Sequence, residues 1–498
     1  MGAKLFGASV RRKEDPRFLR GEGRYVDDIK LPGMLHAAFV RSPHGHARIL
    51  SVKTDAAHRM PGVAHVFAFA DLERWMKPLP LFGSVPPGLA ARVDVTMKQV
   101  PQLAMARDRV LFVGEIVAMV LATSRALAED AGEAVEVTYE PLAAVVDMVA
   151  AAEPGSPVLH GEWGDNVAIH FATGFGDTEA VFRGADVTVR ERFHIQRYVG
   201  MPIETRGVVA QWDTRDGTLT TWNGTQVVHF VQQGLVAALG LPPHKVRVIA
   251  PDVGGGFGTK ATGYPEDLLI PVAAIAARRP VKWVEDRREH MMAAAHARHQ
   301  IHDIEIAARR DGSMLAVRDR IWVDLGAYNS WGIVLPYNTV AHLLGPHRVP
   351  SLSVECRGVV TNKSPNAPYR GAGRPETVFA MDRIVDCLAR ELRMDPAELR
   401  RKNYLSAADM PFQNGAFDGE LTLTARIDQD GDPMTHQKGD VLGTLPKVRV
   451  GSKNVKLTLD QVQKETESLA GPGSMGGGRP PMMPPAHPGG PALPPGHP

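Results

Sequence analysis

Two glycine-rich turns contain the residues with the clearest capacity for chemistry. Residues 251–260 form the first turn, in which four glycines surround Phe257. Residues 369–376 form the second turn, in which Arg370 and Arg374 surround three small residues. Each turn stands between a strand-like run and a helix start, where free backbone N–H groups and the positive end of the helix dipole favour anions. Together they predict a site for one large ligand with several negative charges.

The spacing of the first turn excludes two common nucleotide-binding motifs. Only one residue, Phe257, separates its last glycine, Gly258, from Gly256, whereas the dinucleotide motif requires two intervening residues. Lys260 is preceded by Thr259, so the Gly-Lys pair of a Walker loop is missing. A glycine-rich turn that only permits close packing is an open alternative.

The second turn carries positive charge at a helix start, where the helix dipole disfavours it. A bound phosphate explains Arg370 and Arg374, and an ion pair with carboxylates elsewhere in the chain is the alternative. Other Arg-Arg pairs along the chain are interpreted as solvated faces. The helix that begins at Pro375 has a predicted apolar stripe made of Val378, Phe379, Ile384, Val385, Leu388 and Leu392.

Two further groups of polar residues are weaker candidates. Gln226 stands where a strand ending at Trp222 meets a helix, and a glutamine there is usually only a local hydrogen-bond partner. His36, His44 and His46 have no carboxylate at ligand spacing, so they do not predict a metal site.

The elements that position these residues fall into an α/β region followed by a second mixed region. In the first region, Ser124 is predicted to cap a helix over 125–134. Helices of the second region are predicted to start near Gln226, Pro265, Pro375 and Pro396. The predicted strands are 35–41, 47–53, 63–67, 113–122, 135–139, 187–193, 219–222, 246–250 and 352–360.

The last part of the sequence differs from the rest in residue pattern and composition. Residues 419–463 are β-rich, with alternating strands predicted at 421–427 and 455–459. Residues 466–498 are dominated by proline and glycine and are predicted to be disordered.

Bulk composition excludes several classes of protein. The 498 residues carry a net charge of +2, which gives no electrostatic argument for nucleic acid or an anionic membrane as a partner. No apolar run reaches the ~18 residues that span a bilayer, and the N-terminus lacks the apolar core of a signal peptide. Two isolated cysteines cannot build an iron–sulfur cluster or a disulfide framework. These features predict a cytoplasmic protein.

Several motifs in sequence order resemble one known family. They are the segments 21–28, 41–44, 113–115, 254–258 and 361–374. Over residues 13–413 the chain resembles the molybdenum-binding large subunit of the xanthine dehydrogenase and aldehyde oxidase family, in particular its carbon monoxide dehydrogenase large-chain branch. The resemblance implies an α+β fold, with an α/β hammerhead domain at 15–147 and the first half of a molybdopterin-binding domain at 166–413.

The resemblance also implies roles for individual residues. Gln226 and Arg370 correspond to catalytic positions near the molybdenum and the substrate. The implied cofactor is molybdopterin cytosine dinucleotide, whose dithiolene holds the metal, so no protein side chain is expected as a metal ligand. The implied cofactor-binding residues are Gly255, Gly256, Phe257, Gly258, Arg370, Gly371, Ala372 and Arg374.

The implied reaction is oxidative hydroxylation with oxygen derived from water. Carbon monoxide oxidisers of the family carry a copper-binding cysteine where this chain has Gly371, and purine hydroxylases carry a glutamate where it has Ala261. An aldehyde or N-heterocycle is therefore the predicted substrate. The family's electron transfer implies two partners, an FAD-binding medium subunit and a 2Fe-2S small subunit.

The chain departs from the family after residue 413. The portion that follows in family members contains the glutamate that acts as general base. Residues 419–463 instead resemble the C-terminal domain of a cytochrome c biogenesis factor. Two alternatives therefore stand beside the hydroxylase: a catalytically inactive truncated or fused remnant, and an assembly protein that acts in cytochrome c maturation through residues 419–463.

Overall fold

The computed structural model describes residues 9–79, 81–100 and 102–409, and the strand segments 421–427, 435–436, 441–448, 461–462 and 467–468. Internal contacts divide the chain into residues 1–419 and residues 420–498, and each unit is described by itself. Within the described ranges, every helix is too short or too polar to traverse a lipid bilayer.

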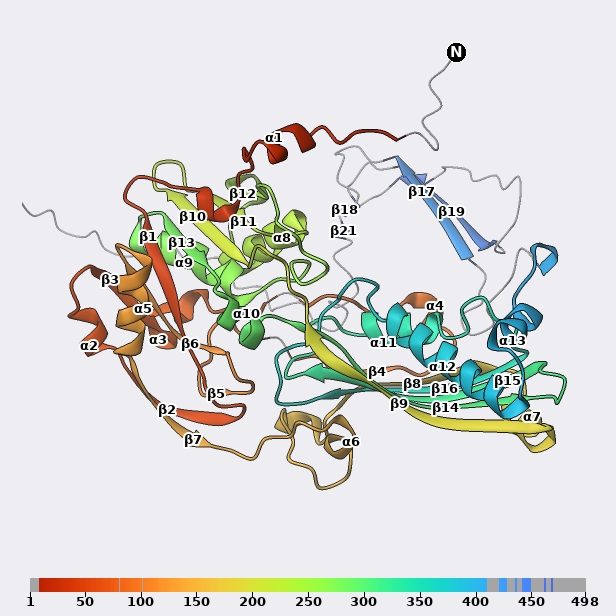
Figure 1. Ribbon diagram of the computed structural model, residues 1–498. Helices are drawn as coiled ribbons and strands as arrows, with labels where there is room; N and C mark the ends of the chain where they lie inside the picture. Colours follow the sequence, from red (N-terminus) through yellow and green to blue (C-terminus); the bar gives the residue numbers. More distant parts are fainter. Residues whose placement is uncertain are drawn as a thin grey trace, which may run out of the picture. The chain divides into compact units, whose positions relative to one another are not determined.

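A seven-stranded mixed sheet forms one half of the first unit (Figure 1). Strands from the two predicted regions share it, because β1 pairs in parallel with β13. Strand β6, next to the edge strand β3, is buried along its whole length. The strand predicted at 113–122 is therefore confirmed over 116–122, whereas Val113 is 41% exposed and lies outside it. In order across the sheet, the strands are β12 (Val246–Ile249), β11 (Thr218–Asn223), β10 (Gly207–Asp213), β13 (Val281–Val284), β1 (Leu35–Arg41), β6 (Ile116–Ala122) and β3 (Val63–Ala68).

Three helices complete the core around this sheet. Helix α9 (Pro265–Ala277) packs on β10 and β13, and α8 (Val228–Leu239) packs on β12. Helix α5 (Arg125–Glu133) packs on β1 and β6, and the hydroxyl of Ser124 accepts the Leu127 N–H, so the predicted cap is confirmed. A small antiparallel sheet lies in the same region, with the order β5 (Arg109–Val110), β2 (Ala47–Lys53) and β7 (Glu136–Pro141).

A six-stranded sheet forms the other half of the first unit. Its only parallel pair is β15 with β16, and the other neighbours in this described sheet are antiparallel. In order, the strands are β4 (Thr96–Met97), β8 (Val167–Phe175), β16 (Ser351–Val360), β15 (Met314–Gly326), β14 (His296–Ala308) and β9 (Val187–Val199).

Helix α12 (Arg374–Leu392) lies across β9 and β14 of this sheet (Figure 1). Its predicted apolar stripe is wrong at Val378 and Phe379, which are 48% and 44% exposed. Phe379 makes an edge contact with Phe193 on β9, the edge strand, so no further strand covers it. The buried face consists of Glu376, Thr377, Ala380, Met381, Ile384, Val385, Cys387, Leu388 and Ala389.

Shorter elements connect these layers. Helix α13 (Pro396–Asn403) packs on α12 and is capped by Asp395, and α11 (Val334–Ala341) packs on α12 and β16. The remaining α-helices of the first unit are α1 (Asp15–Leu19), α2 (Asp55–His58), α3 (Phe69–Leu72), α4 (Pro87–Ala90), α6 (Met148–Ala151), α7 (Thr178–Gly184) and α10 (Arg287–Ala293). Single 3-10 turns occur at Val26–Asp28, Glu73–Trp75, Gly161–Trp163, Pro243–Lys245 and Ala407–Asp409.

The second unit contains two small antiparallel sheets among its described segments. One has the order β17 (Leu421–Ile427), β19 (Val441–Val448) and β20 (Gln461–Val462), and the other pairs β18 (Thr435–His436) with β21 (Glu467–Ser468). The predicted strand at 421–427 is confirmed. The predicted strand at 455–459 lies outside the described residues, as does the predicted disorder of 466–498 apart from β21.

A buried carboxyl group joins the two large sheets of the first unit. Glu115, just before β6, accepts hydrogen bonds from the Tyr328 hydroxyl at 2.7 Å and the Leu111 N–H at 2.6 Å. Burial raises the pKa of Glu115 to about 7, although both hydrogen bonds oppose the change. The native state therefore holds a proton that the unfolded chain releases between pH 4.5 and pH 7.

This proton predicts a specific pH dependence of stability. Between pH 4.5 and 7 the contribution of Glu115 to the free energy of unfolding falls, by about 3 kcal/mol in total. Glu115→Gln keeps an acceptor oxygen for Tyr328 and does not ionise, so its free energy of unfolding is expected to decline less over that range. Urea unfolding of both proteins from pH 4.5 to pH 8 tests this. Parallel profiles would show that Glu115 does not carry the proton.

Candidate active site

The two glycine-rich turns lie directly against each other. The backbone N–H of Arg370 donates to the carbonyl oxygen of Phe257 at 2.8 Å. A Cβ atom on Gly258 would stand 2.3 Å from the carbonyl oxygen of Pro368, so a side chain there would push the turns apart. The sequence predicted one site built from both turns, and the structure places them together.

Gln226 joins the same assembly. Its side-chain oxygen accepts the Gly258 N–H at 2.9 Å, and its backbone N–H donates to the carbonyl of Lys260 at 2.8 Å. A Cβ on Gly256 would lie 2.2 Å from that side-chain oxygen. The amide nitrogen of the exposed Gln226 side chain has no hydrogen-bond partner among the described residues, so it is free to donate to a ligand.

Close packing accounts for several of the glycines. Besides Gly256 and Gly258, Gly254 leaves room for Glu204, whose Cβ would be 2.5 Å from an added side-chain carbon. The close-packing alternative is therefore correct for these three positions, and their glycines do not by themselves indicate a ligand.

Unused hydrogen-bond donors give stronger evidence for a bound ligand. Within segments 254–258 and 371–373 of the two turns, five backbone N–H groups make no hydrogen bond to any part of the chain that the structure describes: those of Gly255, Gly256, Phe257, Gly371 and Gly373. Groups of this kind normally find an acceptor. Their concentration at two adjoining turns is the donor pattern that binds an anion.

The arginines of the second turn add positive charge. Both side chains are exposed, and Arg370 has no side-chain partner within the described ranges. The Arg374 guanidinium lies 3.2 Å from His342 Nε2 and 3.2 Å from the carbonyl oxygen of Gly371. Neither arginine contacts a carboxylate among these residues, so the ion-pair alternative is not supported and the anion interpretation is favoured.

Arg298 forms hydrogen bonds with the second turn, and no sequence motif indicated this contact. Its guanidinium donates to the carbonyl of Arg370 at 2.8 Å, to Glu376 at 2.7 Å and to the Tyr198 hydroxyl at 2.9 Å. Arg298 and the next residue, His299, both have positive φ angles, which interrupt the extended backbone of β14 without shifting its register with β9. The Glu376 carboxylate is thereby paired with Arg298.

Backbone strain concentrates at the same place. Phe257 and Ala372, one in each turn, have φ angles of 55° and 49°, and Arg298 and His299 have 64° and 57°. Left-handed conformations are costly for residues other than glycine, and they occur most often at functional sites.

A network of buried charges lies near Lys260, the last residue of the first turn. Arg206 pairs with Glu266 at 2.9 Å and donates from Nε to Glu285 at 3.0 Å. Arg41 also pairs with Glu266 at 2.7 Å, and so links β1 to the network. Burial opposes ionisation of Glu285, yet the positive charge of Arg206 holds its pKa at about 2.

The shape of the second turn predicts a low tolerance for a side chain at Gly371. Its φ of 107° is unfavourable for other residues, and an added Cβ would lie 2.4 Å from the ring of Pro375. Gly371→Ala is expected to lower the free energy of unfolding by about 1–3 kcal/mol. Gly161→Ala is the control, because nothing lies within 4 Å of its added carbon. Equal denaturation midpoints for the two variants would contradict the prediction.

Comparison with known proteins identifies the architecture. A family model for the aldehyde oxidase and xanthine dehydrogenase a/b hammerhead domain matches residues 20–143, and one for the molybdopterin cofactor-binding domain matches residues 159–404. The predicted order of the two domains and the α+β fold are confirmed. The exact limits 15–147 and 166–413 stay predictions, and neither model extends into 419–463, so the cytochrome c resemblance has no support.

Individual relatives agree with this architecture. The carbon monoxide dehydrogenase large chain of Hydrogenophaga pseudoflava is 40% identical over 80% of this chain and 50% of its own. The nicotinate dehydrogenase large molybdopterin subunit of Eubacterium barkeri is 30% identical over 77% of this chain and 85% of its own. Quinoline 2-oxidoreductase from Pseudomonas putida 86 superposes with a TM-score of 0.77 and 38% identity, covering 82% of this chain and 51% of that one.

This chain spans about half the length of two of these three proteins. The matches nevertheless cover both glycine-rich turns, Gln226 and the elements that position them. The chain therefore belongs to the xanthine dehydrogenase and aldehyde oxidase family of molybdopterin-binding large subunits.

Proposed function

We propose that the two turns hold a molybdopterin cofactor in its cytosine dinucleotide form. The observation that carries this proposal is the set of unused donors: five free backbone N–H groups beside two guanidinium groups that have no carboxylate partner among the described residues. A dinucleotide brings a pyrophosphate and several further acceptors, which match such donors.

Particular residues would share the contact. Gly255, Gly256 and Phe257 offer N–H groups from the first turn, and Gly371 offers one from the second. Gly258 is already engaged by Gln226, so its part is to fix the glutamine. Ala372 shapes the second turn, and Arg370 and Arg374 supply charge. The bound cofactor would contribute the redox centre, while the protein contributes orientation and electrostatics.

We propose oxidative hydroxylation of an aldehyde or N-heterocycle, with water-derived oxygen, as the reaction of the complete enzyme. The name of quinoline 2-oxidoreductase, whose chain shares this fold, supports an N-heterocycle. The Arg370 guanidinium can donate hydrogen bonds to a carbonyl oxygen or a ring nitrogen, and the free amide of Gln226 can donate to an oxygen atom. Both groups would orient the substrate beside the cofactor.

The geometry of Gly371 supports the exclusion of carbon monoxide as substrate. Copper-dependent oxidisers need a cysteine at this position, and here the backbone angle and the adjacent Pro375 ring leave no space for its side chain. Ala261, in place of the glutamate of purine hydroxylases, argues in the same way against xanthine.

We also propose partners that carry the electrons away. The matched relatives carry names of large subunits, and this chain contains only two cysteines, both buried. The expected partners are an FAD-binding medium subunit and a 2Fe-2S small subunit.

Cofactor analysis tests the binding proposal. Protein purified from cells grown with molybdate should contain molybdenum, a fluorescent pterin oxidation product and releasable cytidine monophosphate in equal amounts. Molybdenum and pterin without the nucleotide would exclude the dinucleotide form. Absence of all three would contradict the binding proposal.

Turnover requires a separate test, because two of the three matched relatives are about twice as long as the matched part. The alternative is that this chain is an inactive remnant. The chain should be assayed with aldehydes and quinoline beside a version extended by the remaining half of the Hydrogenophaga large chain. Equal turnover of the two proteins would exclude the inactive-remnant alternative, and turnover by neither would contradict the proposed reaction.

A further inference from the structure

Residues 200–204 lie between the two glycine-rich turns. A Cβ on Gly200 would be 2.2 Å from the Thr259 hydroxyl of the first turn and 2.9 Å from the Tyr369 ring of the second. The Gly200 peptide is therefore in contact with both turns. Any movement of residues 200–204, here called the inner segment, would change how the turns meet.

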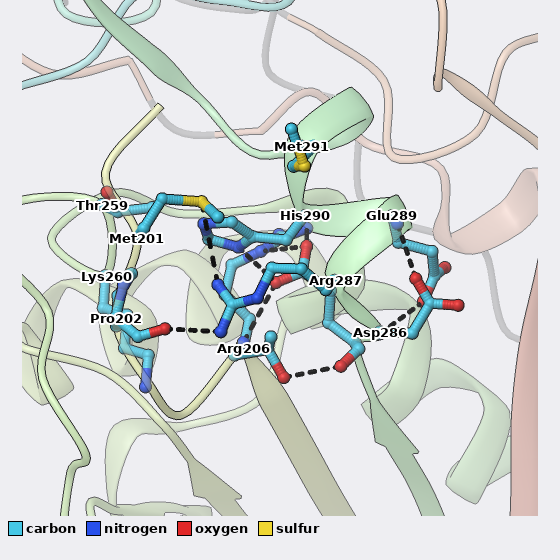
Figure 2. A network of polar contacts seen from close by, with 12 residues as sticks. Met201, Pro202, Arg206, Thr259, Lys260, Asp286, Arg287, Glu289, His290 and Met291 are labelled. Carbon is cyan, nitrogen blue, oxygen red and sulfur yellow. Dashed lines mark hydrogen bonds and ion pairs between the residues drawn. The ribbon is translucent and has the colours of Figure 1, made fainter. Parts of the chain in front are cut away.

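Side chains of helix α10 form hydrogen bonds with backbone carbonyl groups of the inner segment (Figure 2). The Arg287 guanidinium donates to the carbonyl of Pro202 at 2.7 Å and to that of Ile203 at 3.0 Å. His290 Nε2 lies 2.6 Å from the carbonyl oxygen of Gly200. Three carbonyls of a five-residue segment are thus held by two side chains from a single helical turn.

The hydrogen bonds of His290 define its protonation state. The imidazole is fully buried, with Nδ1 at 2.7 Å from a Glu285 oxygen and Nε2 on the Gly200 carbonyl. A carbonyl accepts only, and so does an ionised carboxylate. Glu285 is ionised because it pairs with Arg206. Both ring nitrogens of His290 therefore carry protons, and the side chain is an imidazolium that makes two charge-assisted hydrogen bonds.

The inner segment is itself bonded to the first turn through Glu204. A single oxygen of Glu204 accepts the Gly254 N–H at 2.7 Å and the Lys260 ammonium at 2.7 Å. Glu204 thereby ties together two points near the ends of the turn, on either side of the free N–H groups at 255–257. The Lys260 side chain is completely buried, so its ammonium depends on this carboxylate for charge compensation.

We propose that Arg287 and the protonated His290 are positioning residues for the cofactor site. They fix the inner segment, and through Glu204 they fix the first turn before any cofactor binds. The consequence for cofactor binding rests on the proposed function. The restraint itself is a property of the cofactor-free chain and can be measured there.

Hydrogen–deuterium exchange on the cofactor-free full chain tests the proposal, with Arg287→Met and His290→Gln as variants. Amide exchange at residues 200–204 and 254–260 is expected to become about tenfold faster in each, since charge-assisted hydrogen bonds to the backbone are lost. Arg287→Lys should give an intermediate rate, because one ammonium replaces a guanidinium that reaches two carbonyls.

Arg288→Met is the matched control. Arg288 is the next residue of α10, is exposed, and makes no side-chain contact with the inner segment within the described ranges. Its exchange should equal that of the wild type. Wild-type exchange in Arg287→Met would overturn the proposal even if His290→Gln fails to fold.

Cofactor content separates this proposal from the proposed function. If both hold, molybdenum and pterin per chain fall in Arg287→Met while thermal unfolding changes little. Faster exchange in a protein whose wild type holds no pterin would leave the positioning role intact and contradict the proposed function. If the wild type is loaded with cofactor but exchange in the variants equals that of the wild type, the proposed function stands and the positioning role is contradicted.

Discussion

Arg206→Met is expected to lower the free energy of unfolding by about 3–5 kcal/mol. The Arg206 side chain is 5% exposed, and it neutralises Glu266 and Glu285, which are 2% and 0% exposed. Its guanidinium also stacks on the Tyr264 ring, 3.8 Å from the centroid. Methionine fills much of the volume but leaves Glu285 with only His290, and Glu266 with only Arg41, as cationic partners among the described residues.

Chemical denaturation at neutral pH measures this effect. Arg192→Met is the control, since Arg192 makes a similar two-pronged pair with Asp303 but is 58% exposed. A surface pair contributes little because water screens it. Adding Glu266→Gln and Glu285→Gln to Arg206→Met should recover part of the loss. Similar losses for Arg206→Met and Arg192→Met would show that burial does not govern this network.

The double variant Arg370→Met/Arg374→Met is expected to contain at least about tenfold less molybdopterin per chain than the wild type. Two charge-assisted contacts to an anionic ligand are removed. Thermal stability should hardly change, as both side chains are exposed and neither has a carboxylate partner in the described part of the chain. Molybdenum by elemental analysis and pterin by fluorescence, both per chain, measure the loss.

Arg309→Met/Arg310→Met is the matched control for this pair. It removes the same charge from two neighbouring exposed arginines that follow β14, at the end of the strand opposite Arg298. Its cofactor content should equal that of the wild type. A similar loss in both double variants would mean that net charge, rather than the second turn, governs retention.

Local patterns were sufficient for most elements of the fold. The strands predicted at 35–41 and 47–53 match β1 and β2 residue by residue. Prolines at helix starts located α9 and α13, because proline is favoured in the first turn. Both signals lie within a few residues of the element that they predict.

Long-range pairing could not be predicted in this way. The seven-stranded sheet is joined by β1 and β13, which lie more than two hundred residues apart in the sequence. The pairs of Arg206 with Glu266 and Glu285 span 60 and 79 residues. A charged residue in a strand or helix gives no sign of a distant buried partner, so the whole network near the first turn was missed.

Surface interpretation failed for one arginine pair. Arg287 and Arg288 were expected to form a solvated face, yet only Arg288 is exposed, whereas Arg287 binds two carbonyls of the inner segment. Arg298 was missed for a similar reason, because it lies where β14 departs from an extended backbone, which the sequence does not mark. The sequence motifs identified the two glycine-rich turns. They did not identify the residues elsewhere in the chain that hold these turns in place.

Anomalous diffraction at the molybdenum absorption edge, from crystals of cofactor-loaded protein, tests the central claim most directly. The account predicts one strong peak beside Gln226 and Phe257, with continuous density reaching the second turn at Arg370. A peak on another face of the protein, in crystals whose molybdenum content is confirmed, would contradict it.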